Sequence, residues 1–242
     1  MAHRDFGASA VSDTNVAAET PAYAFTPKPG QTSWWKGDGA QFPYHYPGER
    51  HRYFITRADV LSKAQCQLLI GCFERSREHY AAQTGGDYWK GRFIWQNNLP
   101  ESEIDAIRVM QQVRFLTLAT LNQAVRPDSP LYSDTAQLVR WQEGHELPPH
   151  VDNMEPDGRP NISPHRSFSS ILYLNDDYEG GETFFPGHGI RIKPTAGALV
   201  VFGAGPEYVH GITRVTKGLR YTYAGWFTYD KKFEDPNAPR VF

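Results

Sequence analysis

The stretch SFSSILYLNDDYEGGETFF, residues 167–185, decides the fold of this chain. Its first half is an apolar run typical of a strand, and a cluster of turn residues ends that run. A second short run follows the pair Gly180-Gly181, and Glu182 and Thr183 are interpreted as residues that cap this turn. No helix is predicted after the glycine pair, so we interpret it as a turn and not as a phosphate-binding loop.

Short runs of the same kind recur on both sides of this stretch, from Pro130 to Tyr229. The predicted strands are Ala136–Trp141, Pro149–Asn153, Ser167–Leu174, Glu182–Phe185, Ile190–Ile192, Ala198–Phe202, Glu207–Ile212 and Arg220–Tyr229. Strands this short, with turn residues between them, favour a double-stranded β-helix, also called a jelly roll.

The chain before Pro130 has helical periodicity instead. Ser62 and Gln65 form a capping-box pattern, after which apolar residues recur at helical spacing up to about Ala82. A second helix is predicted over residues 102–124. We therefore expect a mainly β protein whose jelly roll is supported by N-terminal helices.

These patterns also predict the domain organisation. Residues 1–20 are small and polar and are expected to form a disordered leader. Residues 21–242 are predicted to be a single domain, with helical support over 54–130 and a jelly-roll core over 131–230. A proline- and aromatic-rich arm over 21–53 is expected to wrap the domain surface, with a substrate lid as the alternative.

Composition argues against several classes of function. The net charge of −2 and the scattered basic residues give no basis for nucleic-acid binding, and no apolar stretch approaches the roughly 20 residues that cross a membrane. Cys66 and Cys72 lie six residues apart in a predicted helix, about 9 Å along its axis, which is too far for a disulfide. The N-terminus has no apolar signal region, so we expect a cytoplasmic protein.

Three residues form a candidate metal site. Side chains alternate along a strand, so His150 and Asp152 are predicted to point to the same face. His210 begins a later run, and early and late strands of a jelly roll are neighbours, so the three side chains are expected to meet. Two histidines and one carboxylate leave three positions open on a metal, as a non-haem Fe(II) oxygenase requires and a four-ligand structural zinc site does not.

Arg220 adds a candidate anion site. It begins a predicted strand in which Arg220, Thr222, Ala224 and Trp226 share one face. An inward arginine is costly to bury unless it meets an anion. A guanidinium beside the Thr222 hydroxyl suits the distal carboxylate of a small diacid.

With these residues in place, the chain from Gln137 to Phe227 resembles the catalytic domain of the prolyl 4-hydroxylase-type 2-oxoglutarate/Fe(II) dioxygenases. The shared motifs are His-x-Asp at 150–152, Gly-Gly-Glu-Thr-x-Phe-Pro at 180–186, Lys-Pro-x-x-Gly-x-Leu-Val-x-Phe at 193–202, the distal His210, and a basic residue ten positions later at Arg220. The resemblance implies a double-stranded β-helix, an Fe(II) cofactor, and 2-oxoglutarate and O2 as cosubstrates. It also implies hydroxylation of an unactivated C–H bond as 2-oxoglutarate is decarboxylated to succinate.

The resemblance assigns roles residue by residue. Fe(II) is expected on His150, Asp152 and His210, and 2-oxoglutarate on Arg220, Thr222 and Tyr173. Leu147 stands where the family carries a tyrosine three residues before the first ligand, so Thr222 or Tyr173 is expected to replace that hydroxyl. Related halogenases have Gly or Ala in place of Asp152, which favours hydroxylation here.

The substrate is less well defined by the sequence. The missing tyrosine and the aromatic arm favour a free amino acid or a natural-product small molecule, with a peptidyl proline as the alternative. A non-catalytic jelly roll that binds a metal or a carboxylate is the alternative from a different class, and a zinc-dependent isomerase gives no reason for Arg220. Candidate substrate contacts are Arg92, Trp95, Gln96, Asn97, Arg166 and Trp226, although Arg166 also suits a surface ion pair.

Overall fold

A computed structural model describes most of the chain from residue 53 onward. The described residues are 24–25, 32–36, 53–80, 88–125, 127–155, 158–188, 190–192 and 195–238. The predicted leader over 1–20 and most of the aromatic arm over 21–53 lie outside the described residues.

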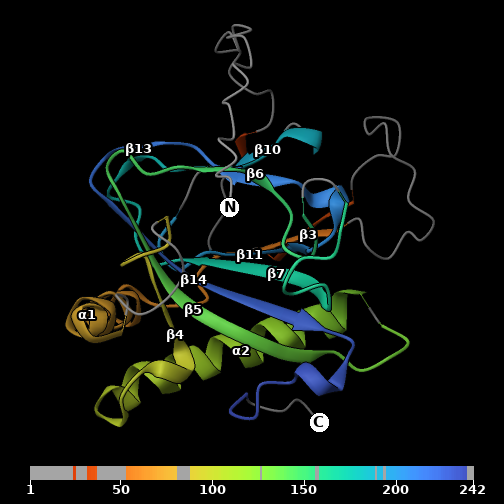
Figure 1. The fold of residues 1–242 in the computed structure, drawn as a ribbon, viewed down its shortest axis with the longest axis horizontal. Coiled ribbons are helices and arrows are strands. Elements are labelled where there is room, and N and C mark those ends of the chain that lie inside the picture. The colour runs from red at the N-terminus through yellow and green to blue at the C-terminus, as the bar shows by residue number, and fades with distance from the viewer. Residues whose placement is uncertain are drawn as a thin grey trace, which may run out of the picture.

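The larger of two facing sheets has seven strands and is mainly antiparallel (Figure 1). Its order is β2 (Thr32–Lys36), β3 (Tyr53–Arg57), β11 (Leu199–Gly203), β7 (Arg166–Tyr173), β14 (Leu219–Thr228), β5 (Tyr132–Gln142) and β4 (Phe93–Trp95). The long strands β5 and β14 pair along nearly their whole length and form the centre of the molecule.

The second sheet lies opposite and has five strands. Its order is β1 (Ala24–Phe25), β10 (Ile190–Ile192), β9 (Thr183–Phe185), β12 (His210–Ile212) and β6 (Leu147–His150), and β8 (Glu179–Gly180) pairs separately with β13 (Val215–Lys217). Two facing sheets, antiparallel except for the β1–β10 pair and joined by crossing connections, form the predicted double-stranded β-helix, which confirms the fold class.

Two helices cover the outer face of the seven-stranded sheet. They are α1 (Lys63–Tyr80) and α2 (Ile104–Val125), and Figure 1 shows α2 running beneath β5 and β14. The predicted capping box is present: the Gln65 backbone N–H donates to the Ser62 hydroxyl at 3.3 Å, and the Gln65 side chain accepts from the Ser62 N–H at 3.0 Å. Short 3-10 helices complete the described elements: η3 (Gln96–Asn98), η4 (Glu101–Glu103), η5 (Pro186–His188), η6 (Pro206–Tyr208) and η7 (Lys231–Phe233).

Strand alternation on β14 separates the core from the cavity. Tyr221 and Tyr223 point to the helices and are buried in the core that the sheet shares with α1 and α2. The alternate residues of β14 point to the other face and line a cavity between the two sheets; they are Arg220, Thr222, Ala224 and Trp226. The predicted inward face of this strand is therefore present as expected.

Two predicted strands have different bounds in the structure. β6 ends at His150, so Asp152 lies in the bend that follows, where its backbone N–H donates to the Ala204 carbonyl at 3.2 Å instead of joining the sheet. Glu207 is not in a strand but in η6, which Pro206 begins. In both places local backbone chemistry overrides the strand pattern.

Two further observations bear on the sequence predictions. Both cysteines are free and buried in α1, as expected for apolar thiols. None of the helices that the structure describes is long and apolar enough to cross a membrane.

Candidate active site

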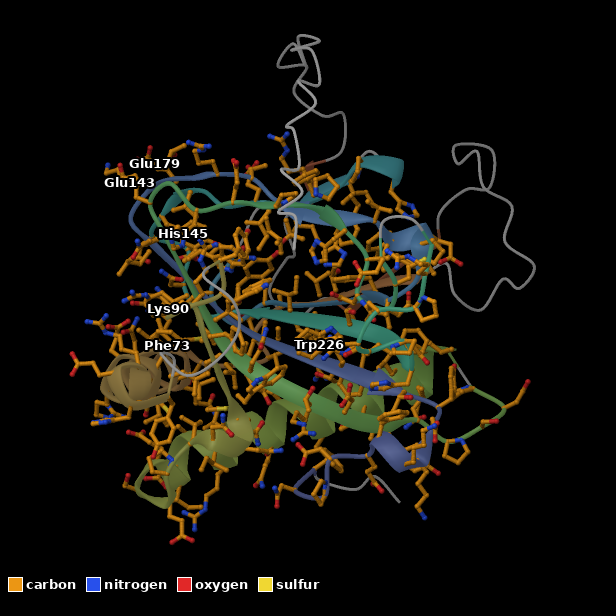
Figure 2. The ribbon with its side chains drawn as sticks, viewed as in Figure 1. Phe73, Lys90, Glu143, His145, Glu179 and Trp226 are labelled. Carbon is orange, nitrogen blue, oxygen red and sulfur yellow. The ribbon has the colours of Figure 1, made fainter. Side chains whose placement is uncertain are left out.

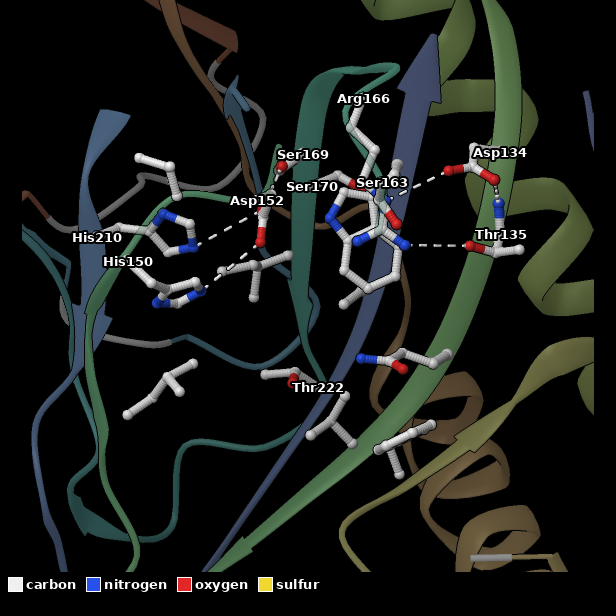
Figure 3. A pocket seen from close by; sticks show the side chains of 18 of the residues that line it. Asp134, Thr135, His150, Asp152, Ser163, Arg166, Ser169, Ser170, His210 and Thr222 are labelled. Atoms are coloured by element: carbon white, nitrogen blue, oxygen red, sulfur yellow. Dashed lines mark hydrogen bonds and ion pairs between the residues drawn. The ribbon is translucent and has the colours of Figure 1, made fainter. Parts of the chain in front are cut away.

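The two histidines of the predicted metal site come from neighbouring strands. His150 ends β6, His210 begins β12, and the two residues are direct partners in this antiparallel pair. The Asp152 carboxylate lies 3.6 Å from Nε2 of His150 through Oδ1 and 3.9 Å from Nε2 of His210 through Oδ2. One atom from each residue lies within 4.8 Å of the others, and Figure 3 shows the three side chains converging. This spacing suits a single metal ion.

Both imidazoles are oriented by the backbone. Nδ1 of His150 lies 3.0 Å from the carbonyl oxygen of Pro148, and Nδ1 of His210 lies 3.0 Å from that of Tyr208. A carbonyl oxygen only accepts hydrogen bonds, so each Nδ1 carries a proton and each Nε2 faces the Asp152 carboxylate. Metal-binding histidines in proteins are held in this way.

The Asp152 carboxylate is also held in place. The Ser169 hydroxyl donates to Oδ2 of Asp152, and the Asn161 amide donates to the Asp152 carbonyl at 3.1 Å. Because these contacts come from β7 and from the loop before it, the carboxylate keeps its position although β6 has already ended.

Burial and mutual contact set the protonation of this group. Burial alone would raise the pKa of Asp152, but the neighbouring imidazoles and the Ser169 hydroxyl hold the pKa of this carboxyl far below its usual range. Burial lowers the pKa of His210 to about 4, whereas at His150 the contact with Asp152 outweighs burial and raises the pKa. At neutral pH the site therefore offers an ionised carboxylate and a neutral His210, the forms that bind metals.

The three side chains lie on the wall of a cavity of about 810 Å³ between the sheets. Two histidines and one carboxylate that face open space match the coordination of a mononuclear non-haem iron, which keeps positions free for other ligands. A double-stranded β-helix with such a site defines the class of protein: a scaffold for metal-dependent oxygen chemistry.

Arg220 borders the same cavity and is almost fully buried, at 1% exposed. Its Nη2 donates to the Thr183 hydroxyl at 3.2 Å, while its Nε has no hydrogen-bond partner. Within the described part of the chain no carboxylate forms an ion pair with Arg220. A buried guanidinium without a counterion is costly, so this end of the cavity is suited to an anion.

Thr183 and Tyr178 are neighbours of Arg220, and sequence reasoning missed this role of both. The Thr183 hydroxyl accepts from Tyr173 at 2.7 Å as well as from Arg220, so Thr183 does more than cap the turn. Tyr178 is half-buried, and its buried hydroxyl lies near Arg220 without a hydrogen bond of ordinary geometry to any described residue. Gly181 makes room for the arginine, because a Cβ there would lie 3.0 Å from the Arg220 Cδ. The alternation along β9 that buries Thr183 was the available signal.

Arg166 borders the same cavity, on the side opposite Arg220. It does not form the surface ion pair considered from the sequence. Its Nε lies 3.3 Å from Oδ2 of Asp134, and its Nη2 donates to the Thr135 hydroxyl at 3.5 Å (Figure 3). The guanidinium carbon lies 3.7 Å from the ring centroid of Trp226. Asp134 and Trp226 thus fix the position of the Arg166 guanidinium beside the cavity.

The C-terminal segment contributes to this side of the cavity. His165 Nε2 lies 3.0 Å from the same Oδ2 of Asp134, and the His165 ring stacks on Phe233 with centroids 3.5 Å apart. Phe233 is in η7, and the segment after η7 is anchored by an Asp235–Arg114 ion pair of 2.8 Å to helix α2. No sequence pattern pointed to this contact.

The structure brings three of the six predicted substrate contacts to the cavity: Trp95, Arg166 and Trp226. The other three lie elsewhere. Gln96 is buried and accepts a hydrogen bond from Tyr223 on the helix side, and Asn97 is exposed, because η3 turns the chain away from the cavity after β4. Arg92 lines a second, separate pocket.

The two hydroxyl residues predicted to contact 2-oxoglutarate, Thr222 and Tyr173, lie in different places. Thr222 lines the cavity next to Arg220, as expected. Tyr173 is fully buried behind Thr183 and contacts it instead of lining the cavity. Leu147, which replaces the family tyrosine, does line the cavity and leaves that wall apolar.

Comparison with known proteins identifies the family that this chain resembles. The family model of the 2OG-Fe(II) oxygenase superfamily matches residues 136–228, which include the His-Asp-His group and Arg220. This match confirms the resemblance that the sequence analysis found over residues 137–227, and the Fe(II) and 2-oxoglutarate of that superfamily are the metal and cosubstrate expected here.

Individual relatives are prolyl hydroxylases. Human prolyl 3-hydroxylase 3 is 34% identical over 146 residues, which are 51% of this chain and 19% of the relative. Rat prolyl 3-hydroxylase 1 is 26% identical over 223 residues, 75% of this chain and 29% of the relative, so the chain spans less than a third of either protein. A viral collagen prolyl hydroxylase from Paramecium bursaria Chlorella virus-1, solved with 2OG, shares the fold with a TM-score of 0.57 and 20% identity, covering 74% of this chain and 96% of that one.

Proposed function

We propose that this chain is a peptidyl prolyl hydroxylase that uses Fe(II), 2-oxoglutarate and O2. The observation that carries the proposal is the single cavity that joins two chemical features: the convergent His150, Asp152 and His210, and the buried Arg220 without a carboxylate partner. A structural metal site gives no reason for the unpaired arginine. An enzyme that positions a diacid beside a metal requires both.

The residues of the metal site have a defined task. His150, Asp152 and His210 would hold Fe(II), and when bound the iron supplies the oxidative chemistry with O2 and 2-oxoglutarate. The contacts to the Pro148 and Tyr208 carbonyls occupy both Nδ1 atoms and leave both Nε2 atoms as the metal-binding atoms. The donor set of two imidazoles and one carboxylate fits Fe(II) and leaves positions open.

Arg220 would bind the distal carboxylate of 2-oxoglutarate. Its Nε, which has no hydrogen-bond partner among the described residues, supplies a donor, and Thr222 supplies a hydroxyl on the same strand face. Burial strengthens these charge-assisted hydrogen bonds, because the local dielectric constant is lower than that of water. The 2-oxoglutarate role of Tyr173 becomes indirect: it orients Thr183, which in turn contacts Arg220.

A peptide is the favoured substrate, in place of the small molecule that the sequence favoured. The relatives described above are named prolyl hydroxylases, and the cavity carries flat apolar surfaces that suit a proline ring. The rings of Trp95 and Trp226 lie 6.1 Å apart, and Arg166 covers the Trp226 face. A peptide carbonyl is a natural acceptor for the Arg166 donors, because Asp134 already neutralises the charge of this arginine.

Mass spectrometry of a Pro-Pro-Gly repeat peptide tests the proposal. With Fe(II), 2-oxoglutarate and O2, the peptide is expected to gain one oxygen atom for each succinate formed. Free L-proline in a parallel reaction distinguishes the small-molecule alternative. Oxidation of free proline without oxidation of any proline-containing peptide would overturn the substrate, and the absence of succinate with either substrate would overturn the enzymatic proposal.

A further inference from the structure

Arg92 points into a second pocket of about 330 Å³ that is separate from the metal cavity. The end of α1, the turn before β4 and the end of β5 form this pocket. Its charged and titratable lining residues are Arg77, Glu78, Lys90, Arg92, Arg140 and His145. Figure 2 shows Lys90 and His145 at one edge of the molecule above α1, apart from Trp226 in the metal cavity.

Positive charge exceeds negative charge around this pocket. The Glu74 carboxylate is shared by two arginines, with its Oε1 3.1 Å from Arg140 Nη1 and its Oε2 3.1 Å from Arg77 Nε. Among the described residues, neither Lys90 nor Arg92 forms an ion pair. Among the described residues, four basic side chains therefore face two carboxylates, Glu74 and the pocket's own Glu78, so two positive charges of this group are unbalanced.

Two aromatic rings hold the Arg92 guanidinium in place, but one of its hydrogen-bond donors has no acceptor among the described residues. Its central carbon lies 4.1 Å from the ring centroid of Tyr88 and 5.4 Å from that of Trp141. Its Nη1 is buried and has no hydrogen-bond partner. An aromatic surface that fixes a guanidinium while a buried donor remains free is an arrangement prepared for an acceptor.

His145 reports the same positive potential. Burial, and then the charges of Arg92 and Arg140, lower the pKa of His145 below its ordinary value. The neutral imidazole accepts a hydrogen bond from the Gln142 backbone N–H at 3.3 Å through Nδ1, so its Nε2 carries the proton and adds another donor beside the arginines.

We propose that this pocket binds a small doubly charged oxyanion of the phosphate or sulfate type. The two unbalanced positive charges match the charge of a phosphate ester, roughly −1.5 to −2 at neutral pH. The volume lies at the lower end of the range for ligand pockets, about 300–1,000 Å³, and is suited to a phosphate group that carries a small organic part. Glu78 and the negative end of the α1 dipole repel an anion, so the oxyanion is placed on the side of Lys90, Arg92 and Arg140.

Isothermal titration tests the site on protein that is loaded with Fe(II) and saturated with 2-oxoglutarate under anaerobic conditions, so that Arg220 is occupied. Sulfate and O-phospho-L-serine are titrated separately at constant ionic strength, which distinguishes a free inorganic anion from an organic phosphate. Saturable binding of one anion per chain is expected. R92Q is expected to weaken binding about tenfold or more, K90Q by a smaller factor, and E78Q to strengthen it.

A matched control removes one positive charge elsewhere. Arg108 is exposed on α2 and paired with Asp105, so R108Q is expected to leave anion binding unchanged. Should R92Q fail to fold, the exposed pair K90Q and E78Q still tests the site, because their effects have opposite signs. Equal affinity of wild type, K90Q and E78Q, or binding of sulfate no stronger than of chloride, would overturn the proposal.

Discussion

Two arginines border the metal cavity, and they differ in whether a carboxylate faces them. Arg220 is 1% exposed, donates to the Thr183 hydroxyl and lies over the Tyr173 ring, and no carboxylate of the described residues pairs with it. Arg166 is less buried, with 13% of its side chain exposed, and Asp134 lies 3.3 Å from its Nε while Trp226 covers its face. The same side chain is thus presented as a free charge on one side of the cavity and as a neutralised pair on the other.

This difference indicates which ligand each side accepts. An unpaired buried guanidinium favours an anion strongly, so the Arg220 side is specific for a carboxylate. A guanidinium that is already paired with a carboxylate keeps its N–H donors but little net charge, so the Arg166 side suits the uncharged groups of a peptide. The two sides of the cavity therefore differ in the ligands that their own side chains favour.

The largest effect is expected from removing the carboxylate of the paired arginine. D134N leaves Arg166 without its counterion in a largely buried place, and we expect the free energy of unfolding to fall by about 2–3 kcal/mol. This value is at the low end for a broken buried pair, because Arg166 borders an open cavity. Chemical denaturation measures it, and R220Q is the matched variant: it removes an unpaired charge and should leave stability unchanged or raise it. Equal losses in both variants would remove the distinction between the two arginines.

The next largest effect concerns 2-oxoglutarate affinity. R220Q removes the charge-assisted hydrogen bonds to the distal carboxylate, so the Kd for 2-oxoglutarate is expected to rise about a hundredfold. R220K keeps the charge but loses the fork of donors and should weaken binding about tenfold. Anaerobic titration of the Fe(II)-loaded protein gives both values. An unchanged Kd in R220Q would place the diacid elsewhere.

A smaller effect is expected on peptide binding. R166Q removes the donors on the other side of the cavity, and the KM for a proline-rich peptide should rise about tenfold while the Kd for 2-oxoglutarate stays within about twofold. The informative result is that the KM for peptide changes while the Kd for 2-oxoglutarate does not. A loss of 2-oxoglutarate affinity as large as that of R220Q would contradict the assignment.

The smallest effect tests the C-terminal contact. F233A removes the ring that stacks on His165, which loosens the Asp134–Arg166 pair, and the KM for peptide is expected to rise about threefold. F233Y keeps an aromatic ring at this position and should restore the wild-type KM. Succinate formation without peptide should be equal in both variants, whereas a general structural defect would lower it in F233A.

The sequence predicted the structure correctly where the pattern lies within a single helix or strand. The helices, most strand positions and the inward face of β14 follow from periodicity within a single segment, and the cavity places Arg220, Thr222 and Trp226 as that periodicity predicts. The resemblance of residues 137–227 supplied the family. These are local patterns, each of which lies within one segment of the chain.

Pairings between distant segments were beyond sequence reasoning. Periodicity gives the face of His150 but not that His210 is its direct strand partner. The convergence of Asp152 was predicted from a strand that in fact ends before it. Ser169 holds the carboxylate of Asp152, and Asn161 holds its backbone carbonyl. Likewise, the contact of Phe233 with His165 depends on how the C-terminal segment docks on α2.

The central claim is that three side chains bind one ferrous ion, and anaerobic equilibrium dialysis with Fe(II) tests it most directly. The wild-type protein is expected to bind one Fe(II) per chain, and H150A, D152A and H210A are each expected to lower the affinity by about a hundredfold or more. H165A and H145A remove imidazoles outside the group and should keep one Fe(II) at wild-type affinity. Unaltered Fe(II) binding by H210A, or equal losses in H165A, would contradict the account.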